Sequence, residues 1–432
     1  MLEDFKFAGP TMKAFFGGGL EAFRFPKKEG RRQTVDVVAT INAIGDTVTQ
    51  KTSLLEEITG HLSPGFLPRW IARSPRLQSM VLWKGDALSD GAGAAIAANC
   101  EHFRYLTIRE WLAPDADQAF ARFLNDLRED MLAEVEIISY NSIGEQSFKA
   151  LGKHRSLQVL KLANLSEDTM TSLDHLKGCT ELHTLVLEDS YGTAQLELRH
   201  NDVFMGVVDW LSSCSNLKDI TLKRMFDAPA ISARVASSPS VKLKKISIES
   251  YTVRGPSAAA FHTALSDQQS LESVWLKGNG EDTNSDDLLI MVQALCNLTN
   301  LRELVLKDVS DEFEESHIES LALHLPSLED FWTSGGDVSG RILPALANLK
   351  NLRNLTLYAM TQFGPHEILD FVSGLDPITQ RGFNLSLMAQ DPEYDLSETQ
   401  QTIIRDVLRT TLEGRFEFVL WREADLSDSE EE

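Results

Sequence analysis

The chain has 432 residues and carries 41 Lys and Arg against 64 Asp and Glu, which gives a formal net charge of −23. This balance argues against DNA, RNA or an anionic membrane as the main partner, because binding any of these needs clustered Lys and Arg. No stretch approaches the ~18 consecutive apolar residues of a membrane-spanning helix, and the N-terminus lacks the regions of a secretory signal. Four cysteines are typical of a reducing compartment. We therefore expect an intracellular protein, cytoplasmic or nuclear.

Residues 1–76 precede the first clear repeat and should form an N-terminal cap. They contain a candidate strand at 35–39 (VDVVA) and helical segments near 51–61 and 66–73. The end repeat of a stacked array has to cover the apolar core and face water at once. We therefore expect one or two degenerate repeats here.

An apolar motif with the ideal form L-x-x-L-x-L returns about every 27 residues between positions 77 and 357. Its eleven copies begin at Leu77, Phe103, Leu132, Leu157, Leu182, Leu217, Leu243, Leu271, Leu301, Leu328 and Leu352. The motif ends with period 2, which indicates a short strand whose leucines face the core, and a helical segment returns the chain to the next strand. Residues 77–382 therefore predict an α/β leucine-rich repeat solenoid, a horseshoe with parallel strands on the concave face and helices on the convex face.

Two segments show how the helices between these strands should begin. Ser142 and Glu145 form a capping-box pattern, in which each side chain bonds the other residue's backbone N–H. Residues 310–325 place acidic residues first and apolar residues at helical spacing afterwards.

The regular form of this fold has an asparagine three residues after the last strand leucine, where it holds the loop backbone. Here the position is occupied by Gly85, Trp111, Tyr140, Leu165, Ser190, Met225, Tyr251, Asn279, Val309, Gly336 and Met360. Only Asn279 fits. The other loops must satisfy their backbone groups in another way.

Three cysteines share one repeat position with leucines. This position, three residues before the first motif leucine, holds Cys100, Cys179, Cys214, Leu298, Leu325 and Leu349. A position shared by Cys and Leu is a buried apolar one. No C-x-x-C pair or histidine partner accompanies the thiols, so we expect no metal site. Trp210 has apolar neighbours at helical spacing and is expected in the core.

The sequence contains no catalytic signature of the G-x-S-x-G, H-E-x-x-H or G-x-x-x-x-G-K-[ST] type. The glycine-rich segment at 90–100 (DGAGAAIAANC) has Ile96 where a phosphate-binding turn needs its third glycine, and it is interpreted as a helix entry. We expect a non-enzymatic protein without a cofactor.

The remaining candidate site is a surface on the concave face. Residues between the strand leucines point there, and stacked strands lie roughly 5 Å apart. The predicted patch consists of Trp275, Val305, Trp332 and Tyr358, with Lys277 and Lys307 beside them. Trp and Tyr with flanking cations are typical of binding hot spots. We expect a protein partner here, and a chain that is monomeric on its own; the alternative is that an irregular loop or the C-terminal cap covers these aromatic residues.

Three acidic segments, 278–287, 308–319 and 389–398, follow strand ends and should lie on one rim. They either attract a basic partner or only support helix N-termini and solubility.

Residues 383–421 should form a C-terminal cap. A strand at 383–387 leads to a helix with a Ser397/Gln400 capping box and a stop at Gly414, and a strand at 415–421 closes the sheet. Residues 422–432 are rich in acidic residues and should be a disordered tail.

The strand segments SLQVLKL, NLKDITL, NLRELVL and NLRNLTL, without an asparagine ladder, resemble the repeat region of F-box/leucine-rich-repeat proteins, in particular the irregular fungal type. The resemblance covers about 77–421 and implies the substrate-recognition region of an F-box-type ubiquitin ligase receptor. An F-box begins with a pattern similar to L-P-x-x-[LIV], and the match in the first 76 residues is Leu67-Pro68-Arg69-Trp70-Ile71. This match directly precedes the first repeat strand, so we expect no recognisable F-box.

An acidic tail after leucine-rich repeats is also similar to the Ran GTPase-activating proteins, which implies a regulator of a small GTPase as the alternative. The repeats of those proteins are similar to a regular L-x-L-x-x-N pattern. The missing asparagines count against this alternative.

Overall fold

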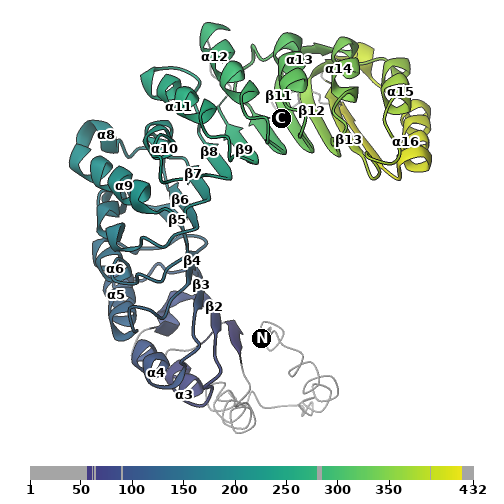
Figure 1. The fold of residues 1–432 in the computed structure, drawn as a ribbon. Helices are drawn as coiled ribbons and strands as arrows, with labels where there is room; N and C mark the ends of the chain where they lie inside the picture. Colours follow the sequence, from purple (N-terminus) through teal and green to yellow (C-terminus); the bar gives the residue numbers. More distant parts are fainter. Residues whose placement is uncertain are drawn as a thin grey trace, which may run out of the picture. The chain divides into compact units, whose positions relative to one another are not determined.

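The computed structural model describes residues 56–60, 62, 65–88, 91–279, 285–389 and 391–420 (Figure 1). The chain divides into two compact units, the first ending at Leu217 and the second beginning at Lys218. The predicted strand at 35–39 and the acidic tail lie outside the described residues. Across the described ranges, no helix is both long and apolar enough to cross a membrane.

The first unit alternates parallel strands with short helices. Its strands are β1 (Glu57–Gly60), β2 (Ser79–Lys84), β3 (Tyr105–Glu110), β4 (Glu134–Ile137), β5 (Val159–Leu165) and β6 (Thr184–Asp189). Its helices are α3 (Leu67–Ala72), η2 (Gly85–Leu88), α4 (Ala92–Asn99), α5 (Ala116–Asp126), α6 (Glu145–Leu151), α7 (Glu167–Met170), η3 (Leu173–Gly178), α8 (Leu196–Arg199) and α9 (Asn201–Ser213). From β1 to β6, each strand pairs in parallel with the next one in the sequence.

The second unit continues the same alternation. Its strands are β7 (Asp219–Lys223), β8 (Lys245–Glu249), β9 (Ser273–Lys277), β10 (Glu303–Lys307), β11 (Asp330–Ser339), β12 (Asn354–Gln362), β13 (Asn384–Ala389) and β14 (Arg415–Leu420). Its helices are α10 (Ala228–Ala236), α11 (Pro256–Ser266), α12 (Ser285–Cys296), α13 (Glu315–His324), η4 (Gly340–Ile342), α14 (Leu343–Ala347), α15 (Pro365–Ser373), η5 (Pro392–Tyr394) and α16 (Glu398–Leu412). Neighbouring strands are again parallel and consecutive.

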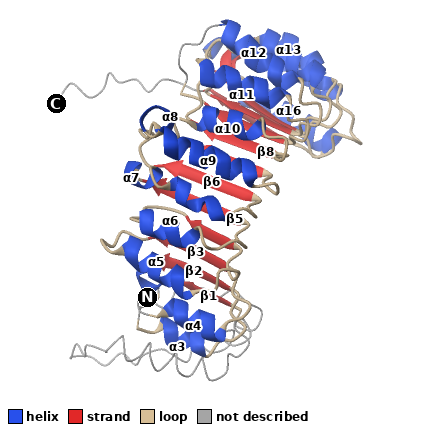
Figure 2. Ribbon diagram, turned by 60° about the vertical axis from the view of Figure 1, so that its left-hand side comes forward, coloured by secondary structure: helices blue, strands red, loops and turns tan. Residues whose placement is uncertain are grey.

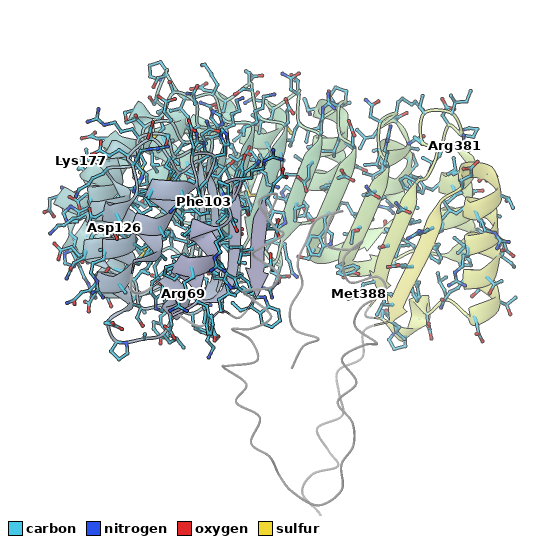
Figure 3. All side chains as sticks on the ribbon, turned by 90° about the horizontal axis from the view of Figure 1, so that it is seen from below. Arg69, Phe103, Asp126, Lys177, Arg381 and Met388 are labelled. Atoms are coloured by element: carbon cyan, nitrogen blue, oxygen red, sulfur yellow. The ribbon has the colours of Figure 1, made fainter. Side chains whose placement is uncertain are left out.

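In each unit the helices lie on one side of the sheet, and the other side is left as an open strand face (Figure 2). Figure 3 marks the two ends of strand β13 in the second unit, with Arg381 just before its start and Met388 near its end. This arrangement of short parallel strands and covering helices confirms the predicted leucine-rich repeat fold.

The motif leucines form the core because equivalent residues stand opposite each other. Leu160 pairs with Leu185, and Leu304 pairs with Phe331, all at most 2 % exposed. Burying a leucine completely stabilises the fold by roughly 1.5–3 kcal/mol. Thr333 replaces a leucine in β11 and is also buried, and its hydroxyl donates to the Ser334 carbonyl oxygen at 3.2 Å.

One repeat-like unit precedes the first predicted motif. Residues 57–60 form strand β1, so the helix expected near 51–61 is wrong over this part. The segment that matched an F-box opening forms α3, and its Leu67 and Ile71 are fully buried. Because α3 connects β1 to β2, it occupies the place of a repeat helix.

The helix starts agree only in part with their predicted caps. Ser397 and Gln400 form the expected capping box of α16, although the left-handed residue at its end is Glu413 and not Gly414. Helix α6 lacks the expected Ser142/Glu145 box. Its first N–H groups are bonded by the carboxylate of Asp117 from α5, at 2.7 Å from Gly144 N and 2.8 Å from Ser147 N. Helix α13 lies within the expected segment 310–325 and has Glu315 in its first turn.

Buried side chains occupy several of the positions where asparagine is missing, although Tyr140 at one of them is exposed. Leu165, Met225, Tyr251 and Val309 are at most 3 % exposed. Each follows a residue in the left-handed region, namely Asn164, Arg224, Ser250 and Asp308. The backbone bonds the next repeat instead, as in the 2.8 Å bond from Tyr251 N to Lys277 O. The expectation that these loops use other partners is therefore confirmed.

Asparagine holds the backbone at a different place from the one the pattern marked. Asn279, which fits the pattern, is exposed. Asn141, one residue after the marked position of its repeat, donates to the Ala163 carbonyl oxygen at 2.6 Å. The expected loop positions Gly336 and Met360 lie inside β11 and β12, which are longer than predicted.

The cysteine position is buried, as expected, but it also serves as a hydrogen-bond donor. Each donor reaches a carbonyl near the end of the preceding repeat's helical segment, in the pairs Cys100–Ser74, Cys179–Leu151, Cys214–Cys179, Gln268–Ala236 and Gln380–Leu349. The carbonyls of Ser74, Leu151 and Leu349 also accept from a backbone N–H three residues later, so the side-chain bond is a second one. The Cys and Gln members of the position therefore bond the preceding repeat, whereas Leu298, Leu325 and Leu349 fill the same position as buried apolar residues. Trp210 lies in the core as predicted and donates to the same Cys179 carbonyl at 2.9 Å.

Candidate functional site

The predicted patch lies on four neighbouring strands of the second unit, β9 to β12. Val305 stands directly opposite Trp275 on one side and Trp332 on the other. Lys307 stands opposite Lys277. These residues alternate with buried strand residues, so all of them point to the open strand face. The patch thus consists of a tryptophan row (Trp275, Val305 and Trp332) and a lysine row (Lys277, Lys307, Ser334 and Tyr358).

Three of the six predicted residues are in direct contact around Trp332. The ring of Tyr358 meets the Trp332 ring edge to face, with centroids 5.5 Å apart and planes at 66°. Lys307 Nζ lies 5.5 Å from the centroid of the same Trp332 ring. Both contacts fit the charge distribution of an aromatic ring, whose face attracts cations and ring edges. Trp332 is therefore fixed by side chains from the strands on both sides.

Trp275 belongs to the same row but makes no ring contact with Trp332, because Val305 lies between them. Lys277 stands beside Trp275 on β9, two residues further along the strand. The structure therefore aligns all six residues on one face and brings Trp332, Tyr358 and Lys307 together as a contact cluster.

All six side chains are half-buried. Neighbouring side chains restrict them, but part of each surface remains open to solvent. The described loops and the described part of the C-terminal cap leave part of each aromatic side chain open to solvent. Half-buried aromatic side chains supply apolar contact area at little further cost in conformational entropy.

The charges around the patch are mostly paired. Lys223 lies 3.6 Å from Glu249, and Lys245 lies 3.7 Å from Glu303. Among the described residues, Lys277 and Lys307 have no carboxylate partner within ion-pair distance. The two lysines that border the tryptophans are thus in no described ion pair, although Glu249, which pairs with Lys223, stands opposite Lys277 in the register.

A polar row at the start of the strands was not predicted. Asn384 donates to Asn354 at 2.7 Å, Asn354 donates to Asp330, and Ser273 donates to Glu303 at 2.5 Å. This row borders the tryptophan row and fixes the strands by side-chain hydrogen bonds. The sequence does contain a signal for this row, because polar side chains stand two residues before each member of the tryptophan row.

The strand face of the first unit carries a separate apolar group that was not proposed as a site. The Arg109 guanidinium lies 5.3 Å from the centroid of the Trp83 ring. Ile138 is 47 % exposed and Tyr140 is 64 % exposed, and Ile138 pairs with the β3 backbone. Trp83, Arg109 and Ile138 occupy the same strand-end column as the lysine row of the second unit, so a pattern search by column would have found these three, whereas Tyr140 stands at the asparagine position.

The acidic segments are only partly described, because 280–284 and 390 lie outside the described residues. Ser285 Oγ donates to Glu312 at 3.3 Å, which brings the first two segments into contact. Glu315 accepts from Ser339 N at 2.5 Å, and hydrogen bonding by the Ser339 side chain, with a smaller part from its backbone N–H, lowers the pKa of the Glu315 carboxyl. In these places the acids hold loop and helix ends.

The titratable groups of the interior are sealed from solvent. Tyr251 Oη hydrogen-bonds His262 Nε2, and burial lowers the pKa of His262 to about 4. Burial raises the pKa of Cys100 to about 11 and those of Cys179 and Cys214 to about 12. The described residues contain no group of three or more His, Cys, Asp or Glu side chains arranged to hold a metal ion.

Comparison with known proteins gives matches only among solved structures. No protein family profile and no curated protein matches the sequence. A chain of the yeast Rad7–Elc1 complex is 14 % identical with a TM-score of 0.44, over 83 % of this chain and 85 % of that one. The PEPR1–AtPEP1 structure is 15 % identical with a TM-score of 0.34, over 85 % and 48 % of the two chains. The TLR13–ssRNA13 structure is 15 % identical with a TM-score of 0.37, over 86 % and 52 %.

Proposed function

We propose that the chain is a non-enzymatic scaffold that binds another protein on the strand face of its second unit. The contact residues are Trp275, Val305, Trp332, Tyr358, Lys277 and Lys307. The observation that carries this proposal is Trp332, a half-buried tryptophan held between Tyr358 and Lys307 on a face that no described helix covers. Binding energy at protein interfaces concentrates in aromatic anchors of this kind.

A pull-down from cell extract with the full chain as bait tests this proposal. Trp275→Ala and Trp332→Ala should each remove specific partners, because truncating an anchor raises the dissociation constant by roughly 30-fold or more. Trp83→Ala is the matched control, since Trp83 is also a half-buried tryptophan on a strand face but lies in the first unit. Equal recovery of specific partners by all three variants would show that the patch is not the binding surface.

In its finer form, the proposal is that the partner is the substrate of an F-box-type ubiquitin ligase receptor. It is supported by the resemblance of the repeat sequences and by the buried residues at the asparagine position, which fit the irregular repeat class. Mass spectrometry of the same pull-downs tests it, because a cullin adaptor should be recovered with the bait. Recovery of specific partners without the adaptor would be consistent with the scaffold role and would contradict the ligase role.

Regulation of a small GTPase is the alternative. Adding the chain to small GTPases and measuring GTP hydrolysis separates the two functions, since only a regulator would change the rate. As a scaffold, the chain is proposed to act as a monomer inside the cell. The free cysteines at 100, 179, 214 and 296 support a reducing compartment.

A further inference from the structure

Lys277 and Lys307 face each other directly across the β9–β10 pair. Like charges opposite each other on neighbouring strands destabilise a sheet. In the second unit's other lysine pairings on this face a glutamate relieves the charge, as with Lys223 and Glu249 or Lys245 and Glu303. Glu249, the partner of Lys223, stands opposite Lys277 on the other side of β9, but no described carboxylate lies within ion-pair distance of Lys277 or Lys307. Lys307 instead extends over Trp332 on β11, which is the side away from Lys277.

The surrounding groups add hydrogen-bond donors but few acceptors. The indole N–H groups of Trp275 and Trp332 bond no acceptor within the described residues, and neither does the hydroxyl of Tyr358. Ser334 is already engaged with Asp308, because its oxygen accepts from Asp308 N at 2.6 Å and its hydroxyl donates to the Asp308 carboxylate at 3.1 Å. Two ammonium groups and these N–H and O–H donors therefore stand around apolar area supplied by Val305 and the aromatic rings.

We infer that the patch recognises an acidic segment of a protein, in which an Asp or Glu carboxylate lies between Lys277 and Lys307 and a neighbouring apolar side chain packs on Val305 and Trp332. A carboxylate would relieve the repulsion between the lysines. It would also accept hydrogen bonds from N–H and O–H groups that otherwise bond only water. Phosphate sites typically use the paired donors of arginine, and the two rows contain no arginine. The inference names the partner for the site under Proposed function and rests on that proposal.

The chain's net charge of −23 does not oppose this assignment at contact distance. At physiological ionic strength, exposed charges are screened beyond about 8 Å. Next to the two lysines, the carboxylate of Glu249 is engaged by Lys223 and that of Asp308 by Ser334, and both ammonium groups remain for a bound carboxylate. Specificity for acidic side chains therefore comes from contacts made within about 8 Å of the two lysines.

A random peptide library displayed on phage and selected on the immobilised full chain tests the inference. Selected peptides should be enriched in Asp or Glu next to an apolar residue. Lys277→Gln combined with Lys307→Gln should weaken a selected peptide about tenfold or more, as should replacing its acidic residue by the amide. Combining both changes should add little, because they remove the same interaction. Lys223→Gln is the matched control and should bind normally, since Lys223 already has Glu249.

Three results would contradict the proposals in different ways. Peptides that need Trp332 but show no acidic enrichment would overturn the acidic segment and leave the scaffold site intact. Peptides that bind the double lysine variant as tightly as the natural chain would do the same. Peptides insensitive to both Trp275→Ala and Trp332→Ala would overturn the site itself, and the acidic segment with it.

Discussion

The buried pair of Tyr251 and His262 shows how single residues replace the regular loop asparagine. Tyr251 occupies the asparagine position, is 2 % exposed, and bonds His262 from α11 with its hydroxyl. The hydrogen bond satisfies two polar groups that would otherwise be buried without a partner. A left-handed Ser250 precedes Tyr251 and directs it into the core.

We predict that His262 makes stability depend on pH. Its folded-state pKa of about 4 lies below the ordinary value of 6.5, so the unfolded chain binds the proton first as the pH falls. The stability is complete above pH 6.5 and is lost between 6.5 and about 4, by up to roughly 3 kcal/mol. Urea unfolding at several pH values checks this, and His262→Gln should flatten the dependence. An equally steep profile for the variant would exclude His262 as the source.

The cysteines should be unreactive while the chain is folded. Burial raises the pKa of each thiol to between about 11 and about 12, so the reactive thiolate is scarce at pH 8. A thiol reagent such as dithionitrobenzoate should therefore label the native chain slowly and all four cysteines after unfolding in guanidinium. Rapid labelling of one or more cysteines in the native chain would show that burial does not protect them.

At the scale of elements, local patterns predicted the strands and missed contacts made between repeats. The leucine spacing identified the strands from β2 to β12, because each core leucine is specified by its own strand. Strand β1 has no leucine motif and was missed, although Ile58 is fully buried. The Ser142/Glu145 box was wrong because Asp117, from the previous repeat, bonds the start of α6.

The candidate site, too, was predicted in its local pattern and missed in its contacts between strands. Alternation along β9 to β12 predicted which six residues share a face. The contacts of Trp332 with Tyr358 and Lys307 depend on strand register and side-chain rotamers, which the sequence pattern does not contain. The polar row from Asp330 to Asn384 was missed because its members are recognised only when the strands are aligned.

The cap of α6 gives a prediction at this scale. Asp117→Ala removes bonds to Gly144 N and Ser147 N and to the Ser147 hydroxyl. The change should destabilise the first unit by about 1–3 kcal/mol, because an N-cap is lost and N–H groups lose their acceptor. Chemical denaturation followed by circular dichroism measures the effect. Ser142→Ala is the control and should change stability by less than about 0.5 kcal/mol, since Ser142 is exposed. Equal effects of the two changes would argue for the box that the sequence predicted.

At the scale of the whole molecule, side-chain bonds between repeats mostly reach only the adjacent repeat. Ser156 bonds Leu132, Ser270 bonds Leu243, and Gln380 bonds Leu349, each separated by about one repeat length in the sequence. Stability in such a structure is approximately a sum of repeat and neighbour terms. Damage to one repeat should therefore remain near its origin.

Hydrogen exchange followed by mass spectrometry tests how far such damage spreads. Leu106→Ala in β3 and Leu385→Ala in β13 each remove a side chain that is at most 1 % exposed, with an expected loss of about 2–5 kcal/mol. Leu106→Ala should speed exchange in β2 to β4 and leave β12 to β14 unchanged, and Leu385→Ala should do the reverse. Leu323→Ala is the control, because Leu323 is 78 % exposed and its truncation leaves no cavity. If either core variant raised exchange equally in both regions, the chain would open as one cooperative structure, and the neighbour-limited account of its stability would be wrong.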